Sequence, residues 1–325
     1  MKTYRSLAEI PPDFGPTVAT IGNFDGVHRG HQWVIAEVIA RARACNATSL
    51  AITFDPHPVR VLHPQIKLSL ITPLEQRLEL LAATGLDAVL VLPFTLELSQ
   101  LSARQFAQQV LRDALHVVEA HEGESFRFGH DAQASAETLD QLGHQLGFGV
   151  RIYAPRSLRG MPISSSRVRT VIAAGDMQSA RALLGRPFSI RSTPARGRGY
   201  GTRYAVPTIN LAPYPELLPA NGVYATLLRI GDGPQAETFE GVTNAGNRPT
   251  FGADSFAVET HLFDFHAISL TENTPLELTF LKRLRDEQRF PSPEALKQQI
   301  GRDVSRAQRL FSLARRLTAP QLQAD

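Results

Sequence analysis

Near its amino terminus the chain reads Thr20-Ile21-Gly22-Asn23-Phe24-Asp25-Gly26-Val27-His28-Arg29-Gly30-His31. An apolar pair, Val18-Ala19, precedes this stretch as part of a short buried strand, and apolar residues at helical spacing follow it between positions 34 and 42. The glycines allow the backbone to approach a ligand closely, and the start of a helix offers unpaired N–H groups to an anion. Two imidazoles at such a turn can bind or protonate phosphate oxygens as negative charge builds up. The chemistry predicted by this stretch is attack on a nucleotide phosphate.

A second buried strand is predicted at Leu50-Ala51-Ile52-Thr53-Phe54, and it ends at Asp55-Pro56-His57-Pro58. Strand, glycine-rich turn, helix and strand form a βαβ unit, which predicts a parallel sheet with a right-handed crossover. Ligands of such sheets bind beyond the carboxyl ends of the strands, where both turns would lie. The prolines stiffen the second turn, and His57 is open to a role as a wall residue rather than a catalyst.

The composition describes a globular protein with two domains. A length of 325 residues exceeds most single cores at roughly 150 residues per domain, and the hydrophobic and charged contents of 43% and 20% are ordinary. The single cysteine, Cys45, excludes an internal disulfide framework and fits a reducing compartment. The first residues lack an apolar signal region, and no apolar run approaches the ~20 residues that span a bilayer. We therefore expect a cytoplasmic protein without membrane contact.

The net positive charge lies in the second half of the chain. Residues 1–185 hold 17 basic and 17 acidic residues, so residues 186–325 hold the remaining 17 and 14 and the whole net charge of +3. Between Asp176 and Glu216 the only charged residues are arginines: Arg181, Arg186, Arg191, Arg196, Arg198 and Arg203. Such a stretch attracts anions, and composition alone leaves a phosphate loop, an RNA-binding arm and a flexible basic linker open.

Hydroxyl groups gather before a predicted helix at Pro162-Ile163-Ser164-Ser165-Ser166-Arg167-Val168-Arg169. With Arg169 one turn into the helix, they form a second candidate anion site, and simple N-capping by Ser165 or Ser166 is the alternative. The next helix is predicted to stop at Gly185, as a glycine C-cap does. This places the domain boundary between residues 185 and 186.

From Ser189 onward the periodicity changes from helical to alternating. Alternation runs through residues 223–228, 256–263 and 276–281, with turn residues between them. Several short strands over ~130 residues predict a small antiparallel β-barrel, which leaves no exposed edges. A terminal helix is expected to start at Ser292-Pro293 and to pack on the barrel through one face: Leu296, Ile300, Val304, Ala307, Phe311 and Ala314.

The segments of the first half resemble the prokaryotic bifunctional riboflavin kinase/FAD synthetases, a branch of the His-x-Gly-His nucleotidyltransferases. Residues 22–31 match the family signature Gly-x-Phe-Asp-Gly-Val-His-x-Gly-His, and residues 53–58 match all of Thr-Phe-Asp-Pro-His-Pro. Residues 163–169 resemble Ile-Ser-Ser-Thr-x-Ile-Arg, and the turn at 123–129 resembles Gly-x-Asp-Phe-x-Phe-Gly. Ser125 departs from the family there, because it stands where Asp or Asn is usual and brings no charge.

This resemblance implies an α/β Rossmann-like nucleotidyltransferase domain over residues 1–185 that transfers AMP from ATP to FMN and releases pyrophosphate. The resemblance assigns catalysis, by stabilising the pentavalent phosphate, to His28 and His31. It assigns nucleotide binding to Gly22, Asn23, Phe24, Asp25, Ser164, Ser165 and Arg169. It assigns flavin binding to Asp55, His57, Pro58, Ser125, Phe126 and Phe128, although the two phenylalanines are equally open to ordinary roles in the core.

The second half resembles the riboflavin kinase part of the same family. Residues 207–210, Pro-Thr-Ile-Asn, resemble Pro-Thr-Ala-Asn, and residues 258–265 match the strand that carries the family's catalytic glutamate. The resemblance implies a kinase over residues 186–325, with Mg²⁺ at Thr208 and Asn210, Glu259 as the base and Arg285 at the flavin. Thr208 and Asn210 point to one side of an extended segment, and their oxygens suit a magnesium ion that bridges ATP phosphates. Residues 201–206 depart from the family pattern, in a loop expected to close over the ligands.

The resemblance thus implies a bifunctional transferase with ATP as co-substrate, riboflavin and FMN as substrates, and small molecules rather than nucleic acid as partners. A monomer or weak homo-oligomer is expected. Three alternatives stay open at this point. The departures at residues 201–206 would permit an FAD synthetase whose barrel only binds flavin, the first domain could serve another phosphate acceptor such as phosphopantetheine, and the arginine run could belong to an RNA-binding regulator.

Overall fold

The computed structural model of the protein describes residues 1–195, 208–247, 256–266, 268 and 270–318. Contacts divide the chain into two units, Met1–Val168 and Arg169–Asp325. Arg196, Arg198, Arg203 and the departures at residues 201–206 lie outside the described residues. Among the helices that are described, none is long and apolar enough to cross a membrane. The predicted boundary at residue 185 stays a prediction.

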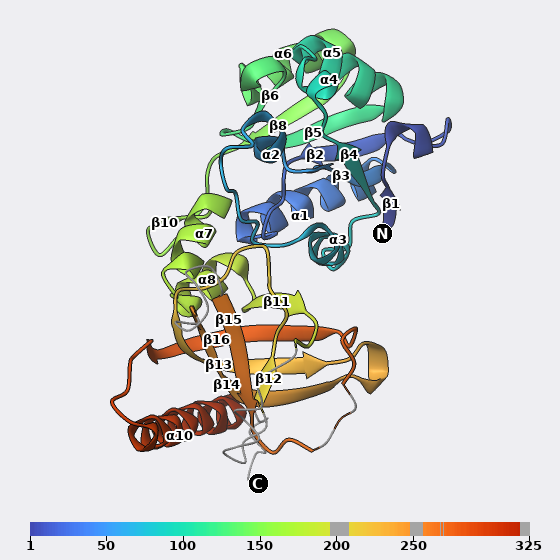
Figure 1. The fold of residues 1–325 in the computed structure, drawn as a ribbon. Helices are drawn as coiled ribbons and strands as arrows, with labels where there is room; N and C mark the ends of the chain where they lie inside the picture. Colours follow the sequence, from blue (N-terminus) through green and yellow to red (C-terminus); the bar gives the residue numbers. More distant parts are fainter. Residues whose placement is uncertain (196–207, 248–255, 267, 269, 319–325) are drawn as a thin grey trace. The chain divides into compact units, whose positions relative to one another are not determined.

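The first unit is built on a parallel sheet of six strands, ordered β1-β4-β3-β2-β5-β8 (Figure 1). All of its strand pairs are parallel, which confirms the predicted fold class. The bounds of the strands are β1 (Lys2–Tyr4), β2 (Thr17–Ile21), β3 (Thr48–Asp55), β4 (Ala88–Pro93), β5 (Val117–Gly123) and β8 (Gly149–Tyr153). Because β3 and β4 lie on one side of β2 while β5 and β8 lie on the other, the strand order reverses between β2 and β5. Ligands of open α/β sheets bind at this reversal.

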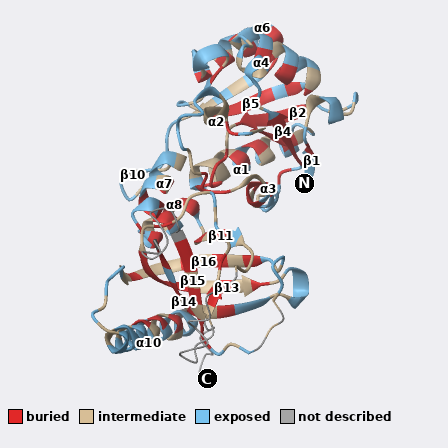
Figure 2. Cartoon of the chain, in the orientation of Figure 1, coloured by how far each residue is buried: buried red, intermediate tan, exposed pale blue. Residues whose placement is uncertain are grey.

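Helices cover both faces of this sheet (Figure 1). Successive residues of a strand point to opposite faces, so Val18 of β2 joins the core under α1 (Arg29–Ala44) and α3 (Leu74–Ala82), whereas Ala19 joins the core on the other side. That second core is closed by η2 (Phe106–Ala114), a π-helix that continues α5 (Ala103–Gln105), and by α6 (Ala136–Leu146). Buried side chains concentrate along the strands between the helix layers (Figure 2).

Short elements connect these layers. They are η1 (Leu7–Glu9), α2 (Pro58–Leu62), α4 (Leu96–Ser99), β6 (Arg127–Phe128), η3 (His130–Ala132), β7 (Ala134–Ser135), β9 (Ser157–Leu158) and β10 (Met161–Pro162). Helix α7 (Ser165–Ala173) runs across the division between the units, and α8 (Met177–Leu184) follows it. Gly185 ends α8 in the left-handed conformation, with φ of 79°, as the sequence predicted.

The second unit is built on an antiparallel sheet of six strands, ordered β11-β16-β13-β14-β15-β12. The strands are β11 (Phe188–Ser192), β12 (Thr208–Asn210), β13 (Gly222–Ile230), β14 (Glu237–Asn247), β15 (Phe256–Leu262) and β16 (Leu276–Asp286), with η4 (Gly233–Gln235) after β13. The two edge strands are joined beyond their ends, because the Ala195 N–H donates to the Asn210 carbonyl and the Ala212 N–H donates to the Thr193 carbonyl, both at 2.8 Å. This confirms the predicted antiparallel barrel.

The terminal helix α10 (Pro293–Thr318) packs on the sheet of the second unit through only part of its predicted face. Ala307 and Phe311 are buried in a core cluster with Val223 and Ala225 of β13. The prediction was wrong for both ends of this face, because Leu296 and Ile300 are each 40% exposed and Ala314 is exposed as well. The helical period continues through the first turns, but the apolar cluster on the sheet reaches the helix only from Val304 onward.

Candidate functional site

The two predicted catalytic histidines lie together at the start of α1. His28 is the N-cap residue of the helix, and its Nδ1 accepts the backbone N–H of His31 at 3.3 Å. Since Nδ1 accepts, the neutral His28 ring carries its proton on Nε2. The two rings stack, with centroids 3.6 Å apart and planes inclined by 17°. A side chain at position 30 would begin 3.2 Å from the His28 ring, so Gly30 allows the ring to lie over the first turn.

The turn between β2 and α1 holds two non-glycine residues in the left-handed backbone region. Phe24 has φ of 47° and Val27 has φ of 38°, and both side chains are buried. Such conformations cost about 1–3 kcal/mol each and persist where the surrounding packing fixes them. The Phe24 ring meets the His31 ring edge-on, with centroids 5.2 Å apart. The strained turn thus fixes the second imidazole.

His31 is held in the neutral state before a ligand arrives. Burial lowers the pKa of His31 well below its usual value, and the neighbouring His28 lowers it further. Its buried Nδ1 has no hydrogen-bond partner within the described part of the chain, and the same is true of Oδ1 of Asn23. Both atoms therefore carry unused hydrogen-bonding capacity at the place where a ligand would bind.

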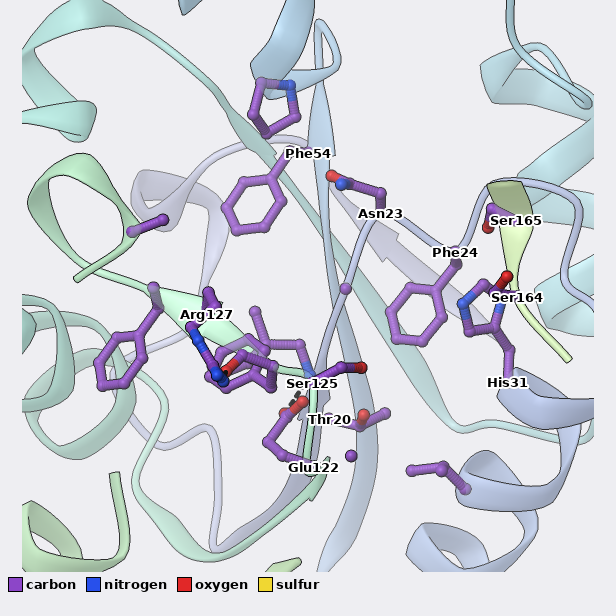
Figure 3. A pocket seen from close by; sticks show the side chains of 18 of the residues that line it. Thr20, Asn23, Phe24, His31, Phe54, Glu122, Ser125, Arg127, Ser164 and Ser165 are labelled. Carbon is purple, nitrogen blue, oxygen red and sulfur yellow. Dashed lines mark hydrogen bonds between the residues drawn. The ribbon is translucent and has the colours of Figure 1, made fainter. Parts of the chain in front are cut away.

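These residues line a cavity of about 640 Å³ at the carboxyl ends of β2, β3, β5 and β8. In Figure 3, His31 lies beside Phe24 with Ser164 and Ser165 nearby, while Phe54 and Arg127 lie across the cavity. Predicted site residues among its lining are Gly22, Asn23, Phe24, His28, His31, Pro58, Ser125, Phe126, Phe128, Ser164 and Ser165. The cavity thus lies where the strand order reverses between β2 and β5, which is where open α/β sheets bind their ligands.

Three other predicted residues of this site stabilise the turns around the cavity instead of lining it. The Asp25 carboxylate accepts the backbone N–H groups of Ile71 and Thr72 at 2.9–3.0 Å. His57 is the N-cap of α2, where its Nδ1 accepts the Val59 N–H at 3.2 Å. The third residue, Asp55, lies 3.9 Å from the buried guanidinium of Arg77. Direct ligand contacts by Asp25, Asp55 and His57 stay predictions.

Among the hydroxyls before α7, Ser164 takes the capping role that the sequence predicted for Ser165 or Ser166, and the anion site stays a prediction. Oγ of Ser164 accepts the Arg167 N–H at 3.2 Å, as an N-cap does. Oγ of Ser165 donates to the carbonyl of Asp25 at 2.9 Å and thereby ties this segment to the β2–α1 turn. Arg169 lies one turn further along α7, and its predicted contact with a nucleotide stays a prediction.

Sequence reasoning missed Arg77, whose side chain is 1% exposed. Its guanidinium donates to the carbonyl oxygen of Asn23 at 2.7 Å and to that of Phe54 at 3.1 Å. Burial lowers the pKa of Arg77, and Asp25 and Asp55 oppose that shift. One side chain therefore joins the two loops that carry the glycine–histidine stretch and the Asp55–Pro58 turn.

Sequence reasoning also missed a group of ionisable side chains that contact the cavity-lining residue Tyr153. Glu119 accepts Nε–H of Arg41 at 2.7 Å and Nε–H of Arg151 at 2.6 Å, and it lies 3.1 Å from Nε2 of His121. With Nε2–H donated to this carboxylate, Nδ1 of His121 accepts the Tyr153 hydroxyl at 2.8 Å. Tyr153 in turn lines the cavity. The available signal was three ionisable residues, Glu119, His121 and Glu122, directly after the apolar pair Val117-Val118.

In the second unit the register of the sheet brings the predicted kinase residues together. Asn210 of β12 lies directly opposite Glu259 of β15, and Thr208 lies opposite His261. Glu259 also pairs with Asn244 of β14. Cross-strand partners share a face of the sheet, and residues two apart do so as well. Thr208, Asn210 and Glu259 therefore share one face, as the magnesium and base assignments require.

Arg285 is engaged by the terminal helix. Its Nε–H donates to the Asp303 carboxylate at 2.9 Å, and its Nη2 lies 2.9 Å from the same carboxylate. The two side chains are 15% and 7% exposed, so this is a mostly buried bidentate pair. The pair fixes α10 to β16, and the flavin contact predicted for Arg285 stays a prediction.

The described residues contain no group of three or more His, Cys, Asp or Glu side chains placed to hold a metal. The face that carries Thr208, Asn210 and Glu259 instead offers hydroxyl, amide and carboxylate oxygens. Magnesium prefers oxygen ligands and is commonly bound through one or two protein groups together with substrate phosphates. The donor set in the second unit therefore fits a magnesium–nucleotide complex better than a dedicated metal cage.

Comparisons with known proteins find a family model for each of two successive parts of the chain. A family model described as FAD synthetase matches residues 10–167, and one described as riboflavin kinase matches residues 184–311. A bifunctional riboflavin kinase/FMN adenylyltransferase of Pseudomonas fluorescens is 38% identical over 315 residues, which cover 95% of this chain and 98% of the relative. The enzyme of that name from Escherichia coli K12 is 33% identical and covers 96% of this chain and 97% of its own.

A solved structure is similar over both units. It is titled a macrolide-efflux protein from Streptococcus pneumoniae, superposes with a TM-score of 0.83 at 25% identity, and covers 94% of this chain and 98% of its own. The full-length similarity to the curated relatives and the matches to both family models lead to one conclusion. The chain belongs to the family of bifunctional riboflavin kinase/FMN adenylyltransferases.

Proposed function

We propose that this chain makes FAD from riboflavin in two ATP-dependent steps. The barrel of the second unit phosphorylates riboflavin to FMN, and the sheet of the first unit joins the AMP of a second ATP to FMN with release of pyrophosphate. The observation that carries the proposal is the stacked pair of His28 and His31 at the N-terminus of α1. Both rings line the cavity at the point where the strand order reverses. Family membership supports both activities.

In the adenylyl transfer, a phosphate oxygen of FMN attacks the α-phosphorus of ATP. The new P–O bond forms as the bond to pyrophosphate breaks, and charge builds up on the oxygens around phosphorus. The Nε2–H of His28 and the ring of His31 can donate to these oxygens, and the N-terminus of α1 adds its dipole. Ser164 and Ser165, which line the cavity, would bind the triphosphate together with Arg169, and Phe126 and Phe128 of the same lining would contact the flavin.

In the kinase step, Glu259 takes the proton of the riboflavin 5′-hydroxyl as that oxygen attacks the γ-phosphorus of ATP. Asn210 lies opposite Glu259, so the base and the amide oxygen face the same ligand. Mg²⁺, held by Thr208 and Asn210 with the ATP phosphates, would neutralise charge on the transferred group. Such transfers depend mainly on positioning and charge neutralisation.

The proposal makes ATP, riboflavin and FMN the partners of this chain. A cytoplasmic location is supported by the use of a single cysteine, Cys45, which has no disulfide partner in the chain. A monomer or weak homo-oligomer is part of the same proposal.

A chromatographic time course of the purified chain with riboflavin, ATP and Mg²⁺ tests both steps. We expect FMN to appear first and FAD to follow. If riboflavin stays unchanged while added FMN becomes FAD, the barrel is a flavin-binding module and the kinase step is refuted. If neither flavin changes, the first unit serves a different phosphate acceptor, and phosphopantetheine is the next substrate to supply.

A further inference from the structure

Glu122 lies at the reversal point of the sheet and has no role in the mechanism above. It is 3% exposed, lines the cavity, and lies beside Thr20 and Ser125 in Figure 3. Backbone pairing of β2 with β5 reaches only to Ala19 opposite Ala120. Beyond that point Oε1 of Glu122 accepts the backbone N–H of Ile21 at 2.6 Å. The carboxyl group thus bridges the two strands where they separate.

The surroundings of Glu122 favour the neutral acid. Among the described residues, no Arg, Lys or His side chain pairs with it, and the Ile21 N–H is its only hydrogen-bond partner. A buried carboxyl group without a cation is protonated instead of carrying an unpaired charge. Burial raises the pKa of Glu122 well above its usual value, and the Ile21 N–H opposes only part of that shift. Oε2 therefore has a proton to donate into the cavity.

We propose that Glu122 is a specificity-determining residue that binds FMN as a neutral carboxylic acid, by donating a hydrogen bond from Oε2–H to an acceptor oxygen of this ligand. The inference rests on the proposed adenylyl transfer. FMN is favoured over ATP because Glu122 belongs to the same short segment as Ser125 and Phe126, and the rings of Phe54 and Phe126 line this cavity. FMN carries a phosphate, so an ionised Glu122 would lose its donor and would also repel the ligand.

Binding of FMN is therefore linked to the protonation of Glu122. The other titratable groups that line the cavity are His28, His31, Glu124, Arg127, Asp131, Tyr153 and Arg156. The pKa of His31 is lowered and that of Tyr153 is raised, so neither of these two groups changes charge between pH 7 and 9.5. A comparison with E122Q, in which this group cannot ionise, separates a loss of FMN affinity caused by Glu122 from one caused by the other groups.

The test is the pH dependence of KM for FMN and of kcat in FAD formation by the full chain, with ATP saturating, between pH 7 and 9.5. For the wild type we expect KM for FMN to rise about tenfold per pH unit above the pKa of Glu122, with kcat and KM for ATP constant. In E122Q the carboxamide can accept from Ile21 and donate into the cavity but cannot ionise. Its KM for FMN should be the same at every pH. E122A lacks the donor, so its KM for FMN should be raised at every pH.

Three results would overturn the inference. An E122A variant whose KM for FMN equals that of the wild type would show that Glu122 does not bind FMN, and so would an E122Q profile that rises like the wild type. A rise in KM for ATP instead of FMN would refute the choice of ligand. Failure of the proposed function looks different, because the wild type would then form no FAD at any pH.

Discussion

Asn210 on β12 and Glu259 on β15 lie directly opposite each other in the antiparallel sheet of the second unit. Side chains in this relationship have Cβ atoms about 4.5–5.5 Å apart on the same face. The short strand β12 therefore brings the Thr208–Asn210 segment onto the strand that carries the proposed base. These residues are about 50 positions apart in the sequence, so only the sheet register joins them.

Replacing Glu259 by Gln should stop riboflavin phosphorylation while FAD formation from added FMN continues. The amide keeps the shape of the side chain but cannot take a proton, and general-base catalysis is worth about 10²–10⁴-fold. The measurement is kcat for each step, followed by chromatography of the flavins. Glu240→Gln is the matched control, because Glu240 lies on the neighbouring strand β14 and pairs with Arg315 of the terminal helix. An equal loss in both variants would refute the role of Glu259.

Thr208→Val should raise the Mg²⁺ concentration needed for half-maximal kinase activity. Valine has nearly the same shape and favours strands, but it removes the hydroxyl oxygen that magnesium prefers. A magnesium titration of FMN formation at fixed ATP measures the change. An unchanged magnesium requirement would show that Thr208 is not a ligand, even if kcat fell.

His28→Asn separates the capping role of His28 from its chemical role. Asparagine is among the best N-cap residues, so its side-chain oxygen should accept the His31 N–H and preserve the start of α1. The imidazole donor is lost, and we expect FAD formation to fall about 10²–10³-fold. Thermal unfolding should change little, whereas His28→Ala should also lose about 1 kcal/mol of stability with the cap. If His28→Asn retains full activity, the imidazole is not catalytic.

Arg77→Met should destabilise the first unit and reduce FAD formation without affecting the kinase step. Methionine fills part of the space but removes the Arg77 donor from the Phe54 carbonyl and leaves the Asn23 carbonyl with only the Thr53 hydroxyl, at 3.3 Å. A buried unsatisfied group costs about 1–3 kcal/mol, so we expect a loss of about 1–3 kcal/mol in free energy of unfolding. Chemical denaturation measures it, and Arg112→Met, at an exposed position, is the control. Equal stability of the two variants would contradict the bridging role.

The parts of the site that follow local sequence rules were predictable. The turn from β2 into α1 is marked by glycines, a preceding apolar pair and a following helical period, and it forms at the predicted residues. Alternation likewise located β13, β15 and β16. These features depend on neighbours in sequence, which a single chain displays directly.

Features that depend on packing between distant segments were not predictable. Arg77 belongs to the regular helix α3, and an arginine in a helix usually faces solvent. It is buried only because the loops after β2 and β3 end beside the same helix. The exposure of Leu296 and Ile300 depends in the same way on how far the apolar cluster of the sheet extends under α10.

Glu122 also predicts a pH dependence of stability that does not involve any ligand. Its pKa is raised by burial in the folded protein, whereas in the unfolded chain it titrates near the ordinary value of about 4.3. Below that value both states are protonated and the group contributes no penalty. As the pH rises, the unfolded state ionises while the folded state stays neutral, so stability falls by about 1.4 kcal/mol per pH unit until the folded-state pKa is reached.

Glu122→Gln removes this penalty. We expect the difference in free energy of unfolding between this variant and the wild type to grow in favour of the variant from pH 4.5 towards pH 8. Chemical denaturation at several pH values measures this change. A packing effect of the amide would be the same at every pH and would not alter the trend. Glu124→Gln, at an exposed neighbouring position, should show a constant difference. A constant difference for Glu122→Gln as well would mean that the carboxyl group is ionised in the folded protein, and that a cation or water compensates its charge.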